Sequence, residues 1–393
     1  MPVKEWVDAC LEELYALRED LHRHPELSHQ EHRTTALIQE RLRSWGIPIL
    51  DFHLDTGVVA RISGGRPGKL LALREDIDAL PIQENTGLPF ASQVPGVSHA
   101  CGHDIHTAAL LGCAKLLSSH REMLHGDVLL VFQCAEESCD GASSMLERGI
   151  FHGQTPDAVV GFHCAPQLPL GTAGILEGAS YASCDTITLT VIGKGAHGAH
   201  PDEGIDPVVM SAGLLMQLQT IVSRRNKATN PVVLTFGEIH GGSAPNIIPH
   251  QVVLRGTLRT FNAQVRKDCL ETLRTLCQDF CRACGGSCDV KLEKSLPPLI
   301  NSPEICRQLR ASAQTALGAG GLACGLAPSM GSDDFSCMLE ACGNHGAQYL
   351  IGTGLETDPA TRLGLHIAGN IFPSEALGSA VATLVQFTLD YLK

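Results

Sequence analysis

Short apolar runs alternate with helical patterns along much of this chain, and this alternation limits the folds that the sequence can adopt. The apolar runs of strand length lie at residues 57–62, 69–73, 127–132, 157–162 and 347–351. Helical patterns separate several of them, notably at 106–118 and 141–147. Strands that alternate with helices form a mostly parallel sheet with helices on both faces. The sequence therefore predicts an α/β protein built around such a sheet.

The segment from 184 to 295 has a different pattern. It predicts a strand, a helix, two strands, a helix and a strand, at 184–192, 205–224, 231–239, 251–260, 264–283 and 287–292. This βαββαβ order is that of the ferredoxin-like unit. A chain of 393 residues is also longer than one hydrophobic core usually organises. We therefore predict a catalytic domain in two parts, 1–183 and 296–393, with an inserted ferredoxin-like domain at 184–295.

Two more helices are expected near the start of the chain, at 3–22 and 30–45. The first segment is charged and amphipathic, so it does not resemble a secretory signal. No run of about 18 apolar residues predicts a membrane span. The 16 cysteines are then expected to be mostly buried free thiols in a reducing cytoplasm.

The net charge of −13 argues against a nucleic-acid partner, because phosphates are bound by clustered Lys and Arg. An acidic chain is compatible with a cation site, although a solvated acidic surface explains most of this charge. We expect neither nucleic acid nor a membrane among the partners.

Side chains that can bind metal follow several of the predicted strands. In open parallel sheets, ligands bind beyond the carboxyl ends of the strands. The residues at these positions, or in the segment that leads into the helix at 106–118, are Asp76, Asp78, Cys101, His103, Glu136, Glu137, His163 and His366. Thiolate, imidazole and carboxylate groups suit zinc-like ions. The sequence therefore predicts a metal site at one edge of the sheet.

Each of these signals is weak when it stands alone. A Cys-x-His pair such as Cys101 and His103 is common without metal, and a histidine after an apolar strand is more often a core residue. Adjacent acids usually face solvent. Glu136 and Glu137, however, follow a strongly apolar strand, and neighbours in an extended chain point to opposite sides. One of them can therefore bind metal while the other faces the substrate as a base.

A set of motifs in this order makes the chain resemble the two-metal metallopeptidase family of aminoacylases, hippurate hydrolases and auxin–amino-acid-conjugate hydrolases. The motifs lie at 21–28 (LHRHPELS), 76–82 (DIDALPI), 99–104 (HACGHD), 135–137 (AEE), 161–163 (GFH), 193–197 (GKGAH), 244–249 (APNIIP) and 331–335 (GSDDF). They span nearly the whole chain. The resemblance implies a catalytic domain of the zinc-exopeptidase type and an inserted lid that forms a homodimer. The strand expected at 251–260 in that lid looks exposed, and such a unit can pair edge to edge with its copy.

The resemblance also implies the roles of individual residues. The metal ligands would be Cys101, His103, Glu137, His163 and His366. Glu136 would be the general base, and Asp78 would orient a ligand. His197 would stabilise the oxyanion, often across a dimer interface, while Asn246 and Gly331 would contact substrate. Asp76 stands where related branches usually carry His, and it is not counted as a ligand.

The implied cofactors are two divalent ions, with Zn, Mn, Co and Ni all compatible with the ligand set. Such ions lower the pKa of water toward about 7, and Glu136 would take its proton and pass it to the leaving amine. The substrate would be a small N-acyl amino acid, hydrolysed to a carboxylic acid and a free amino acid. The motif at 21–28 is expected to be structural, a helix end followed by a turn.

Three other readings stay open at this point. A dipeptidase or aminopeptidase on the same scaffold would need a pocket for a free amine. A binding protein without catalysis would not need Glu136. A structural zinc knuckle would need a second close pair of ligands beside Cys101 and His103. The cysteines at 134, 139 and 164 depart from the family pattern and are expected to be neutral substitutions.

Overall fold

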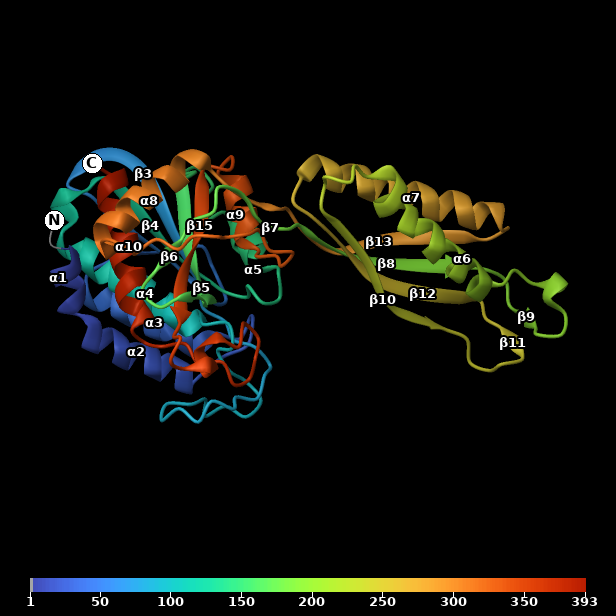
Figure 1. Ribbon diagram of the computed structural model, residues 1–393, viewed down its shortest axis with the longest axis horizontal. Helices are drawn as coiled ribbons and strands as arrows, with labels where there is room; N and C mark the ends of the chain where they lie inside the picture. The colour runs from blue at the N-terminus through green and yellow to red at the C-terminus, as the bar shows by residue number, and fades with distance from the viewer. Residues whose placement is uncertain (1–2) are drawn as a thin grey trace. The chain divides into compact units, whose positions relative to one another are not determined.

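The computed structural model describes residues 3–393, which form two compact units (Figure 1). The first comprises the chain up to Gly178 together with Ile300–Ala327 and Asp334–Lys393. The second comprises Ala179–Leu299 and Pro328–Asp333. The chain passes between the units in the short strands β7 (Gly178–Tyr181) and β14 (Leu299–Asn301), and again on either side of Pro328–Asp333.

A seven-stranded sheet forms the centre of the first unit, in the order β1-β2-β4-β3-β5-β15-β6. Neighbours among β4, β3, β5 and β15 are parallel, whereas β1, β2 and β6 join antiparallel at the two edges. The strands are β1 (Ile49–Leu50), β2 (Val58–Ser63), β3 (Arg66–Asp76), β4 (His125–Gln133), β5 (Ala158–Pro169), β6 (Ala173–Gly174) and β15 (Gly346–Gly354). The central strands are buried along continuous runs, as expected where helices cover both faces.

Helices cover both faces of this sheet (Figure 1). On one side α4 packs against β3, β4 and β5, and α2, α3 and α10 pack around α4. On the other side α5 and α9 pack against each other and against the sheet. The helices are α1 (Val3–Asp8), α2 (Leu11–Arg23), α3 (His32–Ser44), α4 (His103–Ser119), α5 (Gly141–Glu147), α8 (Pro303–Leu317), α9 (Phe335–Ala341) and α10 (Ala376–Tyr391). The central helix, α4, is rich in Leu and Ala, and it is buried on nearly all sides.

The second unit is a four-stranded antiparallel sheet with two helices. Its order is β10-β12-β8-β13, which with the chain order gives the ferredoxin-like topology. Every second residue of β8 is buried, because α6 and α7 pack on one face only. The elements are β8 (Cys184–Ile192), α6 (Pro207–Thr220), a π-helical turn (Ile221–Arg225), β10 (Val232–Gly241), β12 (Gln251–Thr260), α7 (Ala263–Ala283) and β13 (Ser287–Leu296). A short ribbon of β9 (Ala196–His197) and β11 (Ile247–Ile248) completes it.

The structure corrects two details of the prediction. The segment 3–22 forms two helices, α1 and α2, because the chain turns at Cys10, whose thiol donates to the carbonyl of Val7. The strand at 251–260 also looked exposed in sequence, but β12 lies between β10 and β8, so both of its edges are paired. The edge strands of the second unit are β10 and β13. None of the helices between residues 3 and 393 has the length and apolarity that crossing a bilayer demands.

Candidate metal centre

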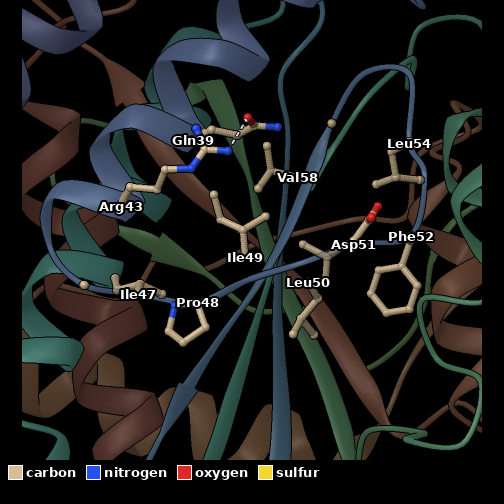
Figure 2. A pocket seen from close by; sticks show the side chains of 13 residues that line it. Gln39, Arg43, Ile47, Pro48, Ile49, Leu50, Asp51, Phe52, Leu54 and Val58 are labelled. Carbon is tan, nitrogen blue, oxygen red and sulfur yellow. Dashed lines mark hydrogen bonds between the residues drawn. The ribbon is translucent and has the colours of Figure 1, made fainter.

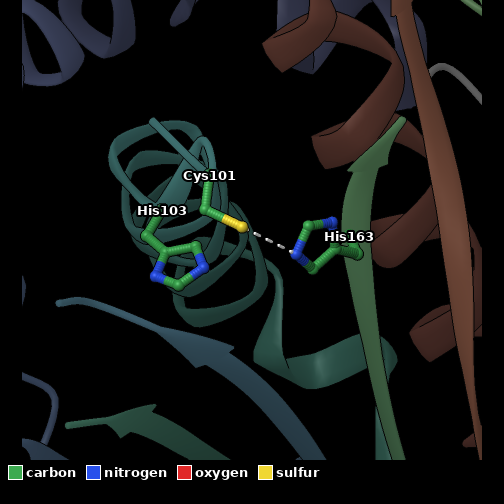
Figure 3. Close-up of side chains that lie close together, drawn as sticks. All are labelled: Cys101, His103 and His163. Atoms are coloured by element: carbon green, nitrogen blue, oxygen red, sulfur yellow. Dashed lines mark hydrogen bonds between the residues drawn. The ribbon is translucent and has the colours of Figure 1, made fainter. Parts of the chain in front are cut away.

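The first part of the site lies at the start of α4. Cys101 and His103 flank Gly102, which has a φ of +91°. A Cβ at Gly102 would lie 3.2 Å from the Cys164 side chain, so both the backbone conformation and the close packing require glycine there. Figure 3 shows Cys101 pointing toward His163 of β5, with 3.4 Å between Sγ and Nε2. The imidazole of His103 lies beside them.

The structure brings the five predicted ligands together. Their donor atoms form overlapping groups in which all atoms lie within 4.8 Å of one another. Two of these groups share the Cys101 thiol: one adds His103 and His163, and the other adds Glu137 and His366. A further group joins His103 with Glu136 and Glu137. Glu136 and Glu137 follow β4 and His163 lies in β5, while the other ligands come from the start of α4 and the loop after β15. Segments that are far apart in the sequence thus meet at one edge of the sheet.

Asp78 holds two of these residues in place. The His103 Nδ1 atom lies 3.0 Å from the carbonyl oxygen of Asp78 and 3.4 Å from its carboxylate, which leaves Nε2 facing the other ligand atoms. The other carboxylate oxygen of Asp78 accepts from the backbone N–H of Glu137 at 3.0 Å. A carboxylate behind a histidine fixes the tautomer and the direction of the ring. Asp78 therefore lies where an orienting residue is needed.

Beside these ligands lies a pair formed by Asp76, which the prediction did not count as a ligand, and His106, which sequence reasoning missed. The His106 Nδ1 atom lies 2.6 Å from Asp76, and its Nε2 accepts from the N–H of Cys164. Asp76 Oδ1 is 3.6 Å from His103 Nε2, and the three residues form another group that could hold a cation. The signal was present in the sequence, because positions three apart on a helix, such as His103 and His106, share one face.

The charges of the cluster fit a cation. Burial alone would lower the pKa of His103, but Asp76, Asp78 and Glu137 raise it to about 10. Burial and the nearby glutamates raise the pKa of the Cys101 thiol well above its usual value. Two ligand atoms, Nε2 of His103 and Oε1 of Glu137, are buried without a hydrogen-bond partner among residues 3–393. The raised pKa values favour the protonated forms of His103 and Cys101, and a divalent cation bound here would displace those protons.

His366 reaches this cluster from a loop after β15. Its Nε2 lies 3.4 Å from Glu137 Oε1, although half of the side chain is exposed. The residue has a φ of +61°, which is uncommon outside glycine, and its N–H donates to the carbonyl of Ala100. The bond to Ala100 ties the loop directly to the segment that carries Cys101.

The residues implied for substrate contact lie in the second unit. His197 in β9 pairs with Ile247 in β11, and the N–H of Gly198 donates to the carbonyl of Asn246. The structure thus places His197 and Asn246 on one short ribbon. Gly331 lies in the same unit, where its N–H donates to the hydroxyl of Ser329.

The sequence pattern of peptidase family M20/M25/M40 matches residues 72–363, which include every predicted ligand except His366. The chain belongs to this family. The M20 resemblance predicted from the motifs is therefore confirmed.

Solved and named relatives agree with this assignment. An N-acetyl-L-cysteine deacetylase of Bacillus subtilis (strain 168) is 42% identical over 328 residues, covering 84% of this chain and 78% of that protein. An N-acyl-L-amino acid amidohydrolase of Geobacillus stearothermophilus is 39% identical over 303 residues, covering 77% and 81%. The crystal structure of a B. subtilis dinuclear metal binding peptidase from the M20 family is 34% identical, covers 98% and 99%, and has a TM-score of 0.81. The predicted fold and the predicted hydrolase class are confirmed.

The extra cysteines of this M20 chain are buried or packed beside the site. Burial raises the pKa of Cys134 to about 12 and that of Cys164 well above its usual value, so both thiols stay protonated and unreactive. Within residues 3–393, no candidate metal group joins Cys101 and His103 to a second cysteine. This argues against the zinc-knuckle reading.

A separate cavity of about 600 Å³ lies between the end of α3 and the start of β2 (Figure 2). Apolar side chains such as Ile49, Leu50 and Val58 line it, and Arg43 bonds Gln39 at its rim. Its lining contains none of the predicted site residues. We assign it no role in the M20 chemistry.

A buried ion cluster supports the loops around the site. His22 lies between Asp104, at 2.8 Å, and Glu84, at 3.2 Å, while Arg18 also bonds Asp104. The adjacent N–H of Asn85 donates to the carbonyl of Ala368, two residues after His366. The cluster therefore holds the 77–98 segment against the loop that carries His366.

His22 should make stability depend on pH. Burial alone would lower its pKa, but Asp104 and Glu84 raise it above the usual value. Its contribution is then fully present below about pH 6.5 and is lost as pH rises through the higher folded pKa. We expect His22→Gln to lower the free energy of unfolding by about 1–3 kcal/mol at pH 6 and by less at pH 9. Urea unfolding at both pH values measures this, and an equal loss at both would contradict it.

Proposed function

We propose that this chain is a two-metal amidohydrolase that cleaves N-acyl amino acids to a carboxylic acid and a free amino acid. The observation that carries the proposal is the pair Glu136 and Glu137, of which Glu137 belongs to a ligand group with Cys101 and His366. Glu136, which is 7% exposed, lies beside these ligands in the group with His103 but in neither group that contains Cys101. The names of the relatives supply the substrate class.

We propose the following roles for the metal ligands. Cys101, His103, Glu137, His163 and His366 would hold two divalent ions, and Cys101 is the residue that two of their groups share. When bound, such ions acidify water and polarise the scissile carbonyl. The metal could be Zn, Mn, Co or Ni, since thiolate, imidazole and carboxylate suit them all.

Glu136 acts as the general base and acid in this scheme. Its carboxylate takes a proton from the attacking water, and the C–N bond breaks as the same proton passes to the leaving amine. Asp78 keeps His103 in one tautomer and holds the backbone of Glu137. His197 is proposed to donate to the oxyanion, and Asn246 and Gly331 to contact the substrate.

The second unit is proposed to form a homodimer interface. Its free edges are β10 and β13, and β10 exposes Val233 and Ile239. An uncovered strand edge readily pairs with a second copy around a two-fold axis. The compartment is proposed to be a reducing cytoplasm, which is supported by the 16 cysteines, all present as free thiols.

A substrate panel tests the function. The metal-loaded protein is assayed with N-acetyl amino acids including N-acetyl-L-cysteine, with hippurate, and with unblocked dipeptides, using each of the four metals. We expect kcat/KM to be about 100-fold or more higher for the acylated substrates, because an unpaired charged amine is costly to bury. Equal or better cleavage of the dipeptides would instead favour a dipeptidase or aminopeptidase. No cleavage of any substrate would favour the binding protein.

A further inference from the structure

The turn between α2 and α3 contacts the segment that carries the two catalytic carboxylates. Glu31, at the end of this turn, is fully buried, and its Oε1 accepts from the backbone N–H of Ala135 at 2.7 Å. Three residues earlier, the Ser28 hydroxyl donates to Asp78 at 2.7 Å. Asp78 in turn accepts from the N–H of Glu137. The turn therefore reaches the backbone on both sides of Glu136.

The segment 135–141 has a strained backbone and forms a tight turn that its own hydrogen bonds hold. Ala135 has a φ of +54°, a left-handed conformation that is unfavourable for a residue with a Cβ. Its carbonyl accepts from the N–H of Gly141, and the N–H of Cys139 donates to the carbonyl of Glu136. A Cβ at Gly141 would lie 1.8 Å from the carbonyl oxygen of Cys134. The direction of the two glutamates thus depends on the backbone geometry at Ala135.

Helix capping does not explain Glu31. Glu31 is the N-cap residue of α3, yet its side chain makes no capping hydrogen bond. The free N–H groups of that helix are bound instead by Glu26, which accepts from Arg33 at 2.9 Å and from Thr34 at 2.8 Å. Burial raises the pKa of Glu31, so placing a carboxyl group there is unfavourable by itself. The carboxyl group of Glu31 instead accepts from the backbone N–H of Ala135 and also bonds the side chain of Thr56.

We infer that Glu31 is a positioning residue, which fixes the strained backbone at Ala135 so that Glu137 points to the metal ligands and Glu136 to the substrate. The inference rests on the proposed function for the role of Glu136. Its effect on Glu137 concerns metal binding alone and can be measured without any substrate. Substitution of a side chain that hydrogen-bonds and orients metal ligands typically lowers metal affinity or activity by about 10–100-fold.

The test compares three substitutions at Glu31. Glu31→Ala removes the acceptor, Glu31→Leu removes it but keeps most of the volume, and Glu31→Gln keeps a carbonyl oxygen that can accept from Ala135. Dissociation constants for Zn²⁺ and Co²⁺ are measured by competition with a chelator, and kcat is measured at saturating metal. We expect both the Ala and Leu variants to bind metal about 10–100-fold more weakly, with a lower kcat. The Gln variant should stay within about threefold of wild type.

Glu26→Ala is the matched control, because it removes a carboxylate from the same turn without touching Ala135. It should lower the urea midpoint through the lost helix cap while leaving metal affinity and kcat unchanged. If Glu31→Ala does not fold, the Leu variant gives the answer. Wild-type metal affinity in a folded Ala or Leu variant would overturn the inference, as would a Gln variant as weak as Ala. Failure of the wild type to hydrolyse any substrate would reject the proposed function but leave the metal affinities as the test.

Discussion

Glu136→Gln is expected to lower kcat by about 100–10,000-fold while the protein still binds its full complement of metal. The glutamine has the same length and shape, but its amide cannot take a proton from water. General acid–base catalysis contributes rate factors of this size. Because Glu137 and not Glu136 lies in the groups that contain Cys101, loss of the Glu136 charge should leave the ligand set intact. Steady-state kinetics and metal analysis of the dialysed protein measure the two effects separately.

Glu137→Gln provides the comparison, since it changes the next residue in the same way. This variant should lose metal as well as activity, because Glu137 Oε1 lies 3.8 Å from His103 Nε2 and 3.4 Å from His366 Nε2. The two variants together separate proton transfer from ligation. Near-normal kcat in a fully metal-loaded Glu136→Gln protein would show that the base has been assigned to the wrong residue.

The sheet was predictable because each central strand contains a continuous apolar run. In β4 the run 128–132 has no polar face, so the pattern predicts a strand buried on both sides. The helices α8, α9 and α10 were not predicted. Helix α9 is only seven residues long, and α10 follows a long irregular segment after β15. That β10 lies at the edge of its sheet and β12 does not depends on pairing between strands far apart in the sequence. A local sequence pattern does not reveal such pairing.

The candidate site was predictable to the extent that strand ends place residues. Knowing that parallel strands end at one edge was enough to bring Glu137 and His163 near Cys101. Contacts that run through the backbone were not predictable in this way. Nothing local to Glu31 indicates that it bonds the N–H of Ala135, 104 residues away. The motif at 21–28 was expected to be structural. Its Ser28, however, donates to Asp78, which in turn contacts the ligand His103.

Cys101→Ala is expected to have the largest effect on metal binding. Its thiol is the one atom shared by the group with His103 and His163 and the group with Glu137 and His366. Removing it would take the shared ligand from both groups, so that less negative charge would remain to balance two divalent cations. Loss of one partner from a buried charged set costs about 3 kcal/mol or more. This corresponds to a dissociation constant that is about 100-fold or more weaker.

Metal content after dialysis against buffered Zn²⁺ measures this effect, with two ions expected for wild type and fewer for Cys101→Ala. Cys113→Ala is the control, because Cys113 is a fully buried thiol on α4 that belongs to no candidate metal group. It should lower stability through the cavity that it leaves but keep both ions. Two ions bound with unchanged affinity in Cys101→Ala would show that the thiol is not a ligand that the two groups need. The two groups would then have to hold their ions through imidazoles and carboxylates alone.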